Sequence, residues 1–298
     1  MPSTRDIRRR IRSVKNTAQI TRAMQLVAAS KMKKAQDQAL SGRHYAELMN
    51  KVLVNLREFS SVESHPLLQA GEGDRDLFVV ITTDKGLCGG LNTNLLKKVV
   101  AEAKDTDSFV TVGKKGRGSL GRLQKDLVAD FSVSDTVDFA EVKLISKFIT
   151  EKFTEGEYGS VKVAFTNFIN TLSQEPHIET LLPVSQVHLG KKKDYEGMGN
   201  EDAANDAPEP SADGGYSFEP DAASVFDTVV PQYVNYEIYQ MVLEGRASEH
   251  SSRMVAMKSA TDNADQIIKD LTLQYNKLRQ AAITSELLEI TTAQMALQ

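Results

Sequence analysis

Apolar residues recur at alternating spacings of four and three along the first 56 residues of the chain. The pattern occupies Ile7, Ile11, Val14, Ala18, Thr21, Gln25, Ala28, Met32, Ala35, Ala39, Gly42, Ala46, Met49, Leu53 and Leu56. Twelve of these fifteen positions are apolar, and no proline follows Pro2 in this stretch. Such heptads predict one helix of about 50 residues, near 75 Å long at 1.5 Å per residue. Its many alanines would let a partner helix approach closely.

The C-terminal end of the chain repeats this rhythm. The positions are Met257, Thr261, Ala264, Ile268, Leu271, Tyr275, Leu278 and Ala282. Pro231 is the last proline, so we expect a helix from about there to the C-terminus, some 65 residues and about 100 Å. Two such helices at opposite ends of one chain most simply pair with each other, antiparallel. A homodimeric coiled coil is the alternative.

Between the two ends, strand-like and helical patterns alternate. Residues 77–82, 109–112 and 161–168 are typical of buried strands, and residues 91–103 and 137–153 of helices. This alternation predicts a parallel α/β unit with right-handed crossovers. Residues 191–224 are acidic and contain several prolines and glycines, which indicates a mobile loop.

The predicted fold class is therefore α/β, with a long antiparallel coiled coil of the N- and C-terminal helices and a central α/β domain. We expect four segments along the chain: an N-terminal coiled-coil helix over 1–60, the α/β domain over 75–190, the acidic loop over 191–224, and a C-terminal coiled-coil helix over 225–298.

Charge is distributed very unevenly. The first 34 residues hold ten basic side chains and one acid, a local charge of +9 within a net charge of −4, so the remainder carries −13. This asymmetry indicates that the N-terminus meets an acidic partner. It also resembles a mitochondrial transit peptide, but the helical pattern continues far past any cleavage point. No apolar run approaches the roughly 18 residues that would span a bilayer.

A glycine-rich turn follows the first strand in LFVVITTDKGLCGGLN, residues 77–92. A phosphate-binding P-loop needs lysine and a hydroxyl after its glycines, whereas Lys85 precedes them and Leu91 follows Gly90. Gly86, Gly89 and Gly90 do not have the dinucleotide-binding spacing either. We interpret this segment as a tight turn that lets a helix pack on the strand end, with a ligand site as the alternative. The basic cluster GKKGRGSLGR, residues 113–122, is interpreted as a solvated turn.

Catalytic constellations are not found in the sequence. The five histidines have no metal-ligand spacing, and no histidine lies near Cys88, the single cysteine. A lone cysteine forms no internal disulfide, which favours a reducing compartment. No aromatic residue that could stack on bases precedes Tyr45.

Three long motifs, however, resemble a known family. They are IRRRIRSVKNTAQITRAMQLVAASKMKKAQ (7–36), TTDKGLCGGLN (82–92) and ASEHSSRMVAMKSATDNADQIIKDLTLQYNKLRQAAITSELLEI (247–290). All three closely resemble the gamma subunit of F-type ATP synthase, and YSFEPD (216–221) resembles a further family segment. The likeness covers nearly the whole chain. It implies a coiled-coil rotor shaft with a Rossmann-like domain that carries no nucleotide.

The resemblance also implies partners and contacts. The shaft would turn inside three alpha and three beta subunits, with epsilon and delta subunits and the membrane c-ring as further partners, and without nucleic acid. Proton-driven rotation would then be coupled to ATP synthesis and hydrolysis on beta. Nine residues are implied as partner contacts: Met24, Arg22, Lys31, Lys33, Arg279, Gln280, Thr284, Glu286 and Tyr216.

Within that set, Met24 and its basic neighbours would face an acidic lever of beta, and the cluster beginning at Arg279 would meet a beta loop. Neighbouring apolar residues would sit in an apolar collar: Ile283, Leu287, Leu288 and Ile290. The bulky C-terminal tip, TTAQMALQ, departs from the glycine- and alanine-rich end that is frequent in the family.

The implied protein is a rotor subunit that also regulates the activity of the complex, and it is not an enzyme and has no cofactor or metal. It would lie peripherally at the cytoplasmic face of a bacterial membrane, with an organellar form as the alternative location. Two other functions remain as alternatives: a nucleotide- or sugar-binding α/β enzyme with helical arms, and a basic coiled-coil protein that binds nucleic acid.

Overall fold

The computed structural model describes residues 3–59, 65–184, 219 and 221–296. The chain divides into two compact units, one formed by Met1–Ala28 with Arg253–Gln298 and the other by Ala29–Ser252. Two long helices, α1 (Thr4–Phe59) and α5 (Ala222–Ala296), each contribute a segment to both units. Their lengths of 56 and 75 residues confirm the two long terminal helices that the heptads predict.

The predicted start of the C-terminal helix, at about residue 231, is wrong. Helix α5 begins at Ala222 and contains Pro231 in its interior. Asp221 sets this start, because its carboxylate accepts the backbone N–H of Ser224 at 2.8 Å and the Ser224 hydroxyl at 2.9 Å, as an N-cap residue does. Proline removes one helical hydrogen bond but does not end this helix.

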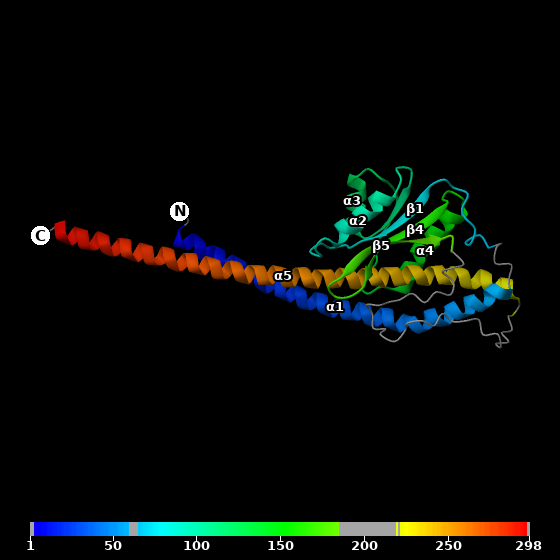
Figure 1. The fold of residues 1–298 in the computed structure, drawn as a ribbon, viewed down its shortest axis with the longest axis horizontal. Coiled ribbons are helices and arrows are strands. Elements are labelled where there is room, and N and C mark those ends of the chain that lie inside the picture. The colour runs from blue at the N-terminus through cyan, green and yellow to red at the C-terminus, as the bar shows by residue number, and fades with distance from the viewer. Residues whose placement is uncertain (1–2, 60–64, 185–218, 220, 297–298) are drawn as a thin grey trace. The chain divides into compact units, whose positions relative to one another are not determined.

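In the first unit, α1 and α5 pack as an antiparallel pair (Figure 1). Arg8 lies against Tyr275 and Thr21 against Thr261, so residue numbers rise on one helix as they fall on the other. The predicted seam is buried at Ile7, Ala18, Thr21 and Ala28 on α1 and at Met257, Thr261 and Ala264 on α5. This confirms the predicted antiparallel coiled coil.

The seam ends earlier on α5 than the heptads predict. Leu278 is half-buried, whereas Ala282 is exposed, as are all described residues from 279 to 295. The reason is length, because α1 begins at Thr4, close to the level at which Arg8 meets Tyr275. Heptads alone do not tell where the partner helix stops.

The second unit is built on one five-stranded sheet in the order β3-β2-β1-β4-β5. Its strands are β1 (Asp76–Ile81), β2 (Ser108–Val112), β3 (Asp126–Phe131), β4 (Ser160–Phe168) and β5 (Gln174–Leu182). The first four are mutually parallel, and only β5 pairs antiparallel with β4. The predicted parallel unit is confirmed for four strands, and the fifth makes the sheet mixed.

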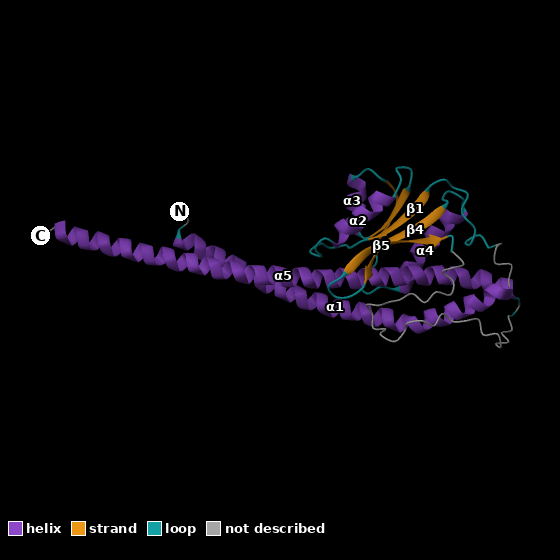
Figure 2. Ribbon diagram, in the orientation of Figure 1, coloured by secondary structure: helices purple, strands orange, loops and turns teal. Residues whose placement is uncertain are grey.

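Helices cover both faces of this sheet (Figure 2). One face packs on α2 (Leu91–Glu102) and α3 (Lys114–Arg122) through a small core around Phe78, Val80 and Phe109. The other face packs on α4 (Phe139–Thr154) and on the segments of α1 and α5 in this unit, through a larger core. Alternating residues of β1 enter the two cores, as the period of a strand requires.

Two strands and one helix were not expected from the sequence. Both β3 and β5 are edge strands, with exposed polar residues in β3 and Pro176 in β5, so neither carries a continuous apolar run. The basic cluster at 113–122 was interpreted above as a solvated turn, and this interpretation is wrong, because the cluster forms α3. Glycine at 116, 118 and 121 disfavours a helix, so its formation depends on contacts from elsewhere in the unit.

Candidate functional site

The turn after β1 supplies the contacts that begin α3. Thr82 Oγ1, the Thr83 carbonyl oxygen and Asp84 Oδ1 accept the backbone N–H groups of residues 116, 115 and 114, at 2.8, 3.0 and 3.1 Å. Gly113, the cap residue of α3, contributes no side chain to this role. The first turn of α3 is therefore capped by the TTD of the glycine-rich motif. The donors that a phosphate would need at this helix start are already bonded.

Glycines in this region have two separate roles. Gly89 has a φ of +59°, a left-handed conformation that favours glycine, and it closes the turn before α2. Close packing comes instead from the second glycine cluster, because a Cβ on Gly113 or Gly116 would lie 2.3 or 2.8 Å from Thr82. The interpretation of a turn rather than a nucleotide loop agrees with this geometry, although the glycines that allow close approach are those of residues 113–116.

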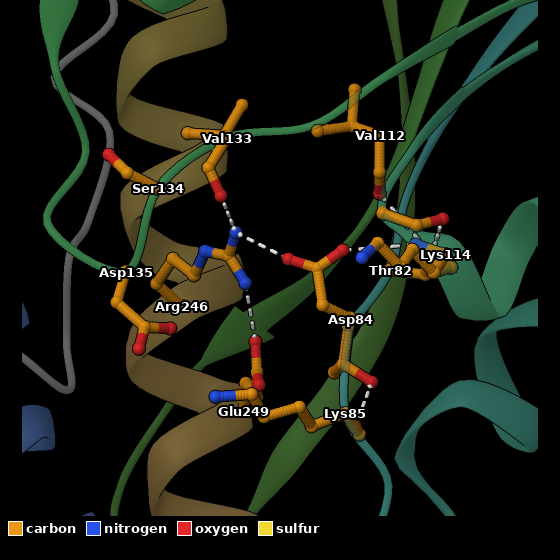
Figure 3. A network of polar contacts seen from close by, with 12 residues as sticks. Thr82, Asp84, Lys85, Val112, Lys114, Val133, Ser134, Asp135, Arg246 and Glu249 are labelled. Carbon is orange, nitrogen blue, oxygen red and sulfur yellow. Dashed lines mark hydrogen bonds and ion pairs between the residues drawn. The ribbon is translucent and has the colours of Figure 1, made fainter.

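The same turn is bonded to α5 through a buried charge network (Figure 3). Arg246 of α5 has a side chain that is only 6% exposed. Its guanidinium pairs with Glu249 at 2.9 Å and with Asp84 at 3.4 Å, and it also donates to the Val133 carbonyl oxygen. Glu249 is buried and Asp84 half-buried. One cation thus joins α5, the turn after β1 and the loop after β3.

Three serines just beyond Arg246 also bond to the α/β part of this unit, two of them to other segments and Ser252 to the turn after β1. Each hydroxyl donates to a main-chain carbonyl oxygen at the carboxyl end of a strand or in the loop that follows it. The bonds run from Ser248 to Thr166 (2.9 Å), from Ser251 to Thr171 (2.8 Å) and from Ser252 to Cys88 (2.7 Å). Residues 246–252 of α5, which we call the anchor segment, therefore make directional contacts with four separate loops or strand ends.

The side chains of this turn hold the fold together, and the cavity beside them is small. A cavity of about 10 Å³ lies between Thr83, Thr166 and Arg246, which is room for one water molecule and far too little for a nucleotide. Asn92 fixes the turn further, because its amide donates to Thr83 Oγ1 at 2.8 Å and contacts the Cys88 sulfur at 3.4 Å. Over the part of the chain that the structure describes, no group of three potential metal ligands occurs.

Sequence-predicted partner residues on the N-terminal helix lie in both units. In the first unit, Arg22 is exposed and pairs with Asp265 across the seam at 3.5 Å, and Met24 is half-buried. In the second unit, Lys31 pairs with Asp135 and lowers the pKa of that carboxyl by hydrogen bonding, while Lys33 is exposed.

Those on the C-terminal helix belong to the first unit. Arg279, Gln280, Thr284 and Glu286 are all exposed on α5, past the end of the seam. The Thr284 hydroxyl donates to the Gln280 carbonyl oxygen of its own helix at 3.0 Å. Tyr216, with most of the predicted acidic loop, lies outside the described residues.

Arg246 is a residue that motif reading does not identify. It lies one residue before the ASEHSS string, and an isolated arginine in MVLEGRASEH looks like any exposed helix position. The available signal was the apolar surroundings, since Met241, Val242 and Leu243 are all buried. A charged residue one turn from such a run is a candidate for a buried ion pair.

No described helix is long and apolar enough to cross a membrane.

Comparisons with known proteins agree over the full length. A family profile described as ATP synthase matches residues 3–297. The ATP synthase gamma chain of Opitutus terrae is 49% identical and covers 99% of both chains, and that of Akkermansia muciniphila is 47% identical and covers 100% of both. Among solved structures, the rotor of the Euglena gracilis mitochondrial ATP synthase is similar with a TM-score of 0.64 at 19% identity, covering 94% of this chain and 98% of that one. The central stalk of the Tetrahymena thermophila enzyme gives 0.57 at 25% identity, covering 81% and 99%.

Proposed function

The chain belongs to the ATP synthase family as one of its gamma chains, and from this premise we propose that it is the central rotor shaft of a proton-translocating ATP synthase. It couples rotation of the membrane c-ring to ATP synthesis and hydrolysis on the beta subunits, and it takes part in regulating that activity. The solved Tetrahymena chain to which it is similar is described as part of a central stalk and c-ring assembly.

Its role is mechanical and not catalytic. The capped start of α3 and the cavity of about 10 Å³ favour a structural turn over a nucleotide site. Catalysis then resides on beta, and this chain biases each beta subunit among conformations that differ in nucleotide affinity. Its partners are three alpha and three beta subunits, epsilon, delta and the c-ring. It lies peripherally at the cytoplasmic face of a bacterial membrane.

The observation that carries the proposal is the exposed end of α5. Beyond the seam, large apolar side chains are open to water: Ile283 (49% exposed), Leu287 (58%), Leu288 (62%), Ile290 (62%) and Met295 (79%). Their apolar surface indicates that another protein covers them, because contiguous exposed apolar surface marks interaction sites. A sleeve of alpha and beta subunits that encloses the shaft end covers this apolar surface.

Polar contacts with beta are assigned to residues around this end and on α1. Arg279, Gln280, Thr284 and Glu286 meet a beta loop, and exposure leaves their side chains accessible to it. Arg22, Met24 and Lys33 face an acidic lever of beta. Lys31 pairs with Asp135 within this chain, so it contacts beta only when this ion pair breaks and Lys31 pairs with a carboxylate of beta instead. Tyr216 is assigned to a further partner contact.

Reconstitution tests the proposal directly. We expect the chain to form a stable complex with alpha and beta subunits of its host, measured by native mass spectrometry, and to support ATP hydrolysis. A variant with Arg9→Glu and Arg10→Glu should weaken that complex, because both arginines are exposed on the +9 segment. Failure to assemble with alpha and beta would contradict the proposal. Tight binding to DNA or RNA with a steep salt dependence would favour the nucleic-acid alternative.

A further inference from the structure

We propose that the anchor segment, residues 246–252 of α5 with Arg246 as its main positioning residue, carries torque between the shaft helix and the α/β domain. The α/β domain here means the sheet with α2, α3 and α4. The inference rests on the proposed rotor function, and it assigns the part of this chain that keeps helix and domain turning together.

Helix α5 is held on the α/β domain by two kinds of contact, apolar burial and hydrogen bonds. Apolar residues of α5 such as Val234, Ile238 and Val242 are buried in the larger core of the unit. Hydrophobic burial is non-directional, so it defines the axial and rotary position of a helix on a sheet less sharply than directional contacts do. Hydrogen bonds weaken steeply when their geometry changes, and they therefore fix the helix in one position.

The directional contacts of the anchor segment are close together along α5. Arg246 bonds to Asp84 and Val133, and the three serines bond to carbonyl oxygens in β4, in the loop after β4 and in the turn after β1. All these contacts fall within seven residues, about two turns of helix. The segment ends at Ser252, where the compact unit also ends, and α5 continues without a break to Ala296. The anchor segment is therefore continuous, within one helix, with the part of α5 that pairs with α1 in the first unit.

Arg246 makes the largest number of contacts in the anchor segment. Its planar guanidinium reaches two carboxylates and a carbonyl oxygen on three different segments at once, which a lysine ammonium does less well. Asp84 in turn accepts the N–H of residue 114, so the same carboxylate holds both α5 and the start of α3. Loss of the arginine would leave Glu249 and Asp84 near each other without this cation, a costly arrangement in a buried place.

The test compares two arginine-to-methionine variants in the complete complex, reconstituted into vesicles. Arg246→Met removes the buried cation. Arg117→Met, the matched control, removes an arginine of α3 that pairs with Asp130 of β3 at 3.2 Å on the same domain but is 65% exposed. ATP hydrolysis and ATP-driven proton pumping are measured together. We expect the number of protons pumped per ATP to fall about fivefold or more for Arg246→Met, the lower end of typical coupling effects, and to stay at the parent value for the control.

A second variant and a rescue separate torque transfer from mere folding. If Arg246→Met does not assemble, the triple variant Arg246→Met, Asp84→Asn, Glu249→Gln removes the buried charges together, while the amide oxygen that replaces the Asp84 carboxylate can still accept the N–H of residue 114. It should assemble and show the same fall in pumping per ATP. For Arg246→Ala, millimolar guanidinium should restore part of the ratio, and an equal concentration of sodium should not.

Two results separate this inference from the proposed function. If the parent complex pumps protons and the Arg246 variants assemble and pump at the parent ratio, the anchor carries no torque and the inference is wrong, while the rotor function stands. If the parent chain assembles no pumping complex with its host subunits, the rotor function fails and the inference fails with it.

Discussion

A pair of threonine hydroxyls at the centre of the seam gives a quantitative test of the shaft. Thr21 Oγ1 and Thr261 Oγ1 lie 2.6 Å apart, and both residues are buried. Each hydroxyl also lies near a carbonyl oxygen of its own helix, Ala18 at 3.1 Å and Met257 at 2.9 Å. Two protons serve these three contacts, so at any moment one hydroxyl donates across the seam and the other donates within its own helix.

This geometry fixes the size of the effect. Thr21→Val or Thr261→Val removes the one bond across the seam, and the remaining hydroxyl keeps its bond within its own helix. The cost is that of a single neutral hydrogen bond, about 0.5–1.5 kcal/mol, without an unsatisfied buried group. The double variant also loses the remaining bond within one helix, but a threonine hydroxyl that bonds back to a carbonyl oxygen of its own helix adds little or no net stability. The cost of the double variant should therefore equal that of either single variant and not their sum.

Amide hydrogen exchange of the intact chain is the appropriate assay, because the chain has two compact units and its unfolding need not be two-state. Under conditions where exchange reports the opening equilibrium, each single variant should speed exchange around residues 14–28 by about two- to twelvefold. The control Thr17→Val removes an exposed hydroxyl bonded to the Ser13 carbonyl oxygen and should leave exchange there nearly unchanged. Additive effects of Thr21→Val and Thr261→Val would refute the contact and, with it, this antiparallel register.

Three further predictions concern coupling, ligands and pH. Changing Arg279 and Gln280 together to Ala should lower ATP hydrolysis by the assembled complex about tenfold or more, because a charged hydrogen bond contributes about 1.5–3 kcal/mol. If the double variant hydrolyses ATP at the parent rate, these two residues make no coupling contact. Calorimetry of the isolated chain should detect no micromolar binding of ATP, ADP or NAD, and such binding would revive the enzyme alternative. Burial lowers the pKa of His65, although the nearby Asp227 carboxylate acts in the opposite direction. The unfolded chain therefore binds a proton more readily than the folded chain, and the free energy of unfolding should fall as the pH drops below about 6.5. His65→Gln should flatten that dependence in denaturant unfolding between about pH 5 and 8, and an unchanged slope would exclude this histidine as its cause.

The terminal helices were predictable because heptads report directly on burial. Every seam position from Ile7 to Gly42 is buried or half-buried. The sequence could not reveal that the seam stops before Ala282, because that limit depends on where the other helix begins. The sequence also could not show that this helix begins before Pro231, because its start depends on the cap formed by Asp221.

The α/β domain was predictable only where its strands are central. Residues 77–81 form an apolar run, and five of the eight residues at 161–168 are apolar. In the edge strands, by contrast, polar residues or proline occupy more than half of β5, and every residue of β3 is exposed or half-buried. The helix over residues 114–122 is glycine-rich and exists because residues 82–84 cap it, a contact made by residues about 30 positions away. Arg246 depends on similarly distant partners. The partner contacts assigned to Met24, Arg279 and their neighbours derive from family motifs and remain predictions.

Rotation of this subunit within the assembled complex tests the central claim most directly. Leu172 is 82% exposed and the single native cysteine, Cys88, is buried, so Leu172→Cys provides one accessible thiol for attaching a bead or rod. With alpha and beta immobilised on a surface, we expect ATP to drive the label in one direction, in steps that reflect three catalytic sites. A complex that hydrolyses ATP at the parent rate while the label on this subunit stays still would contradict the account.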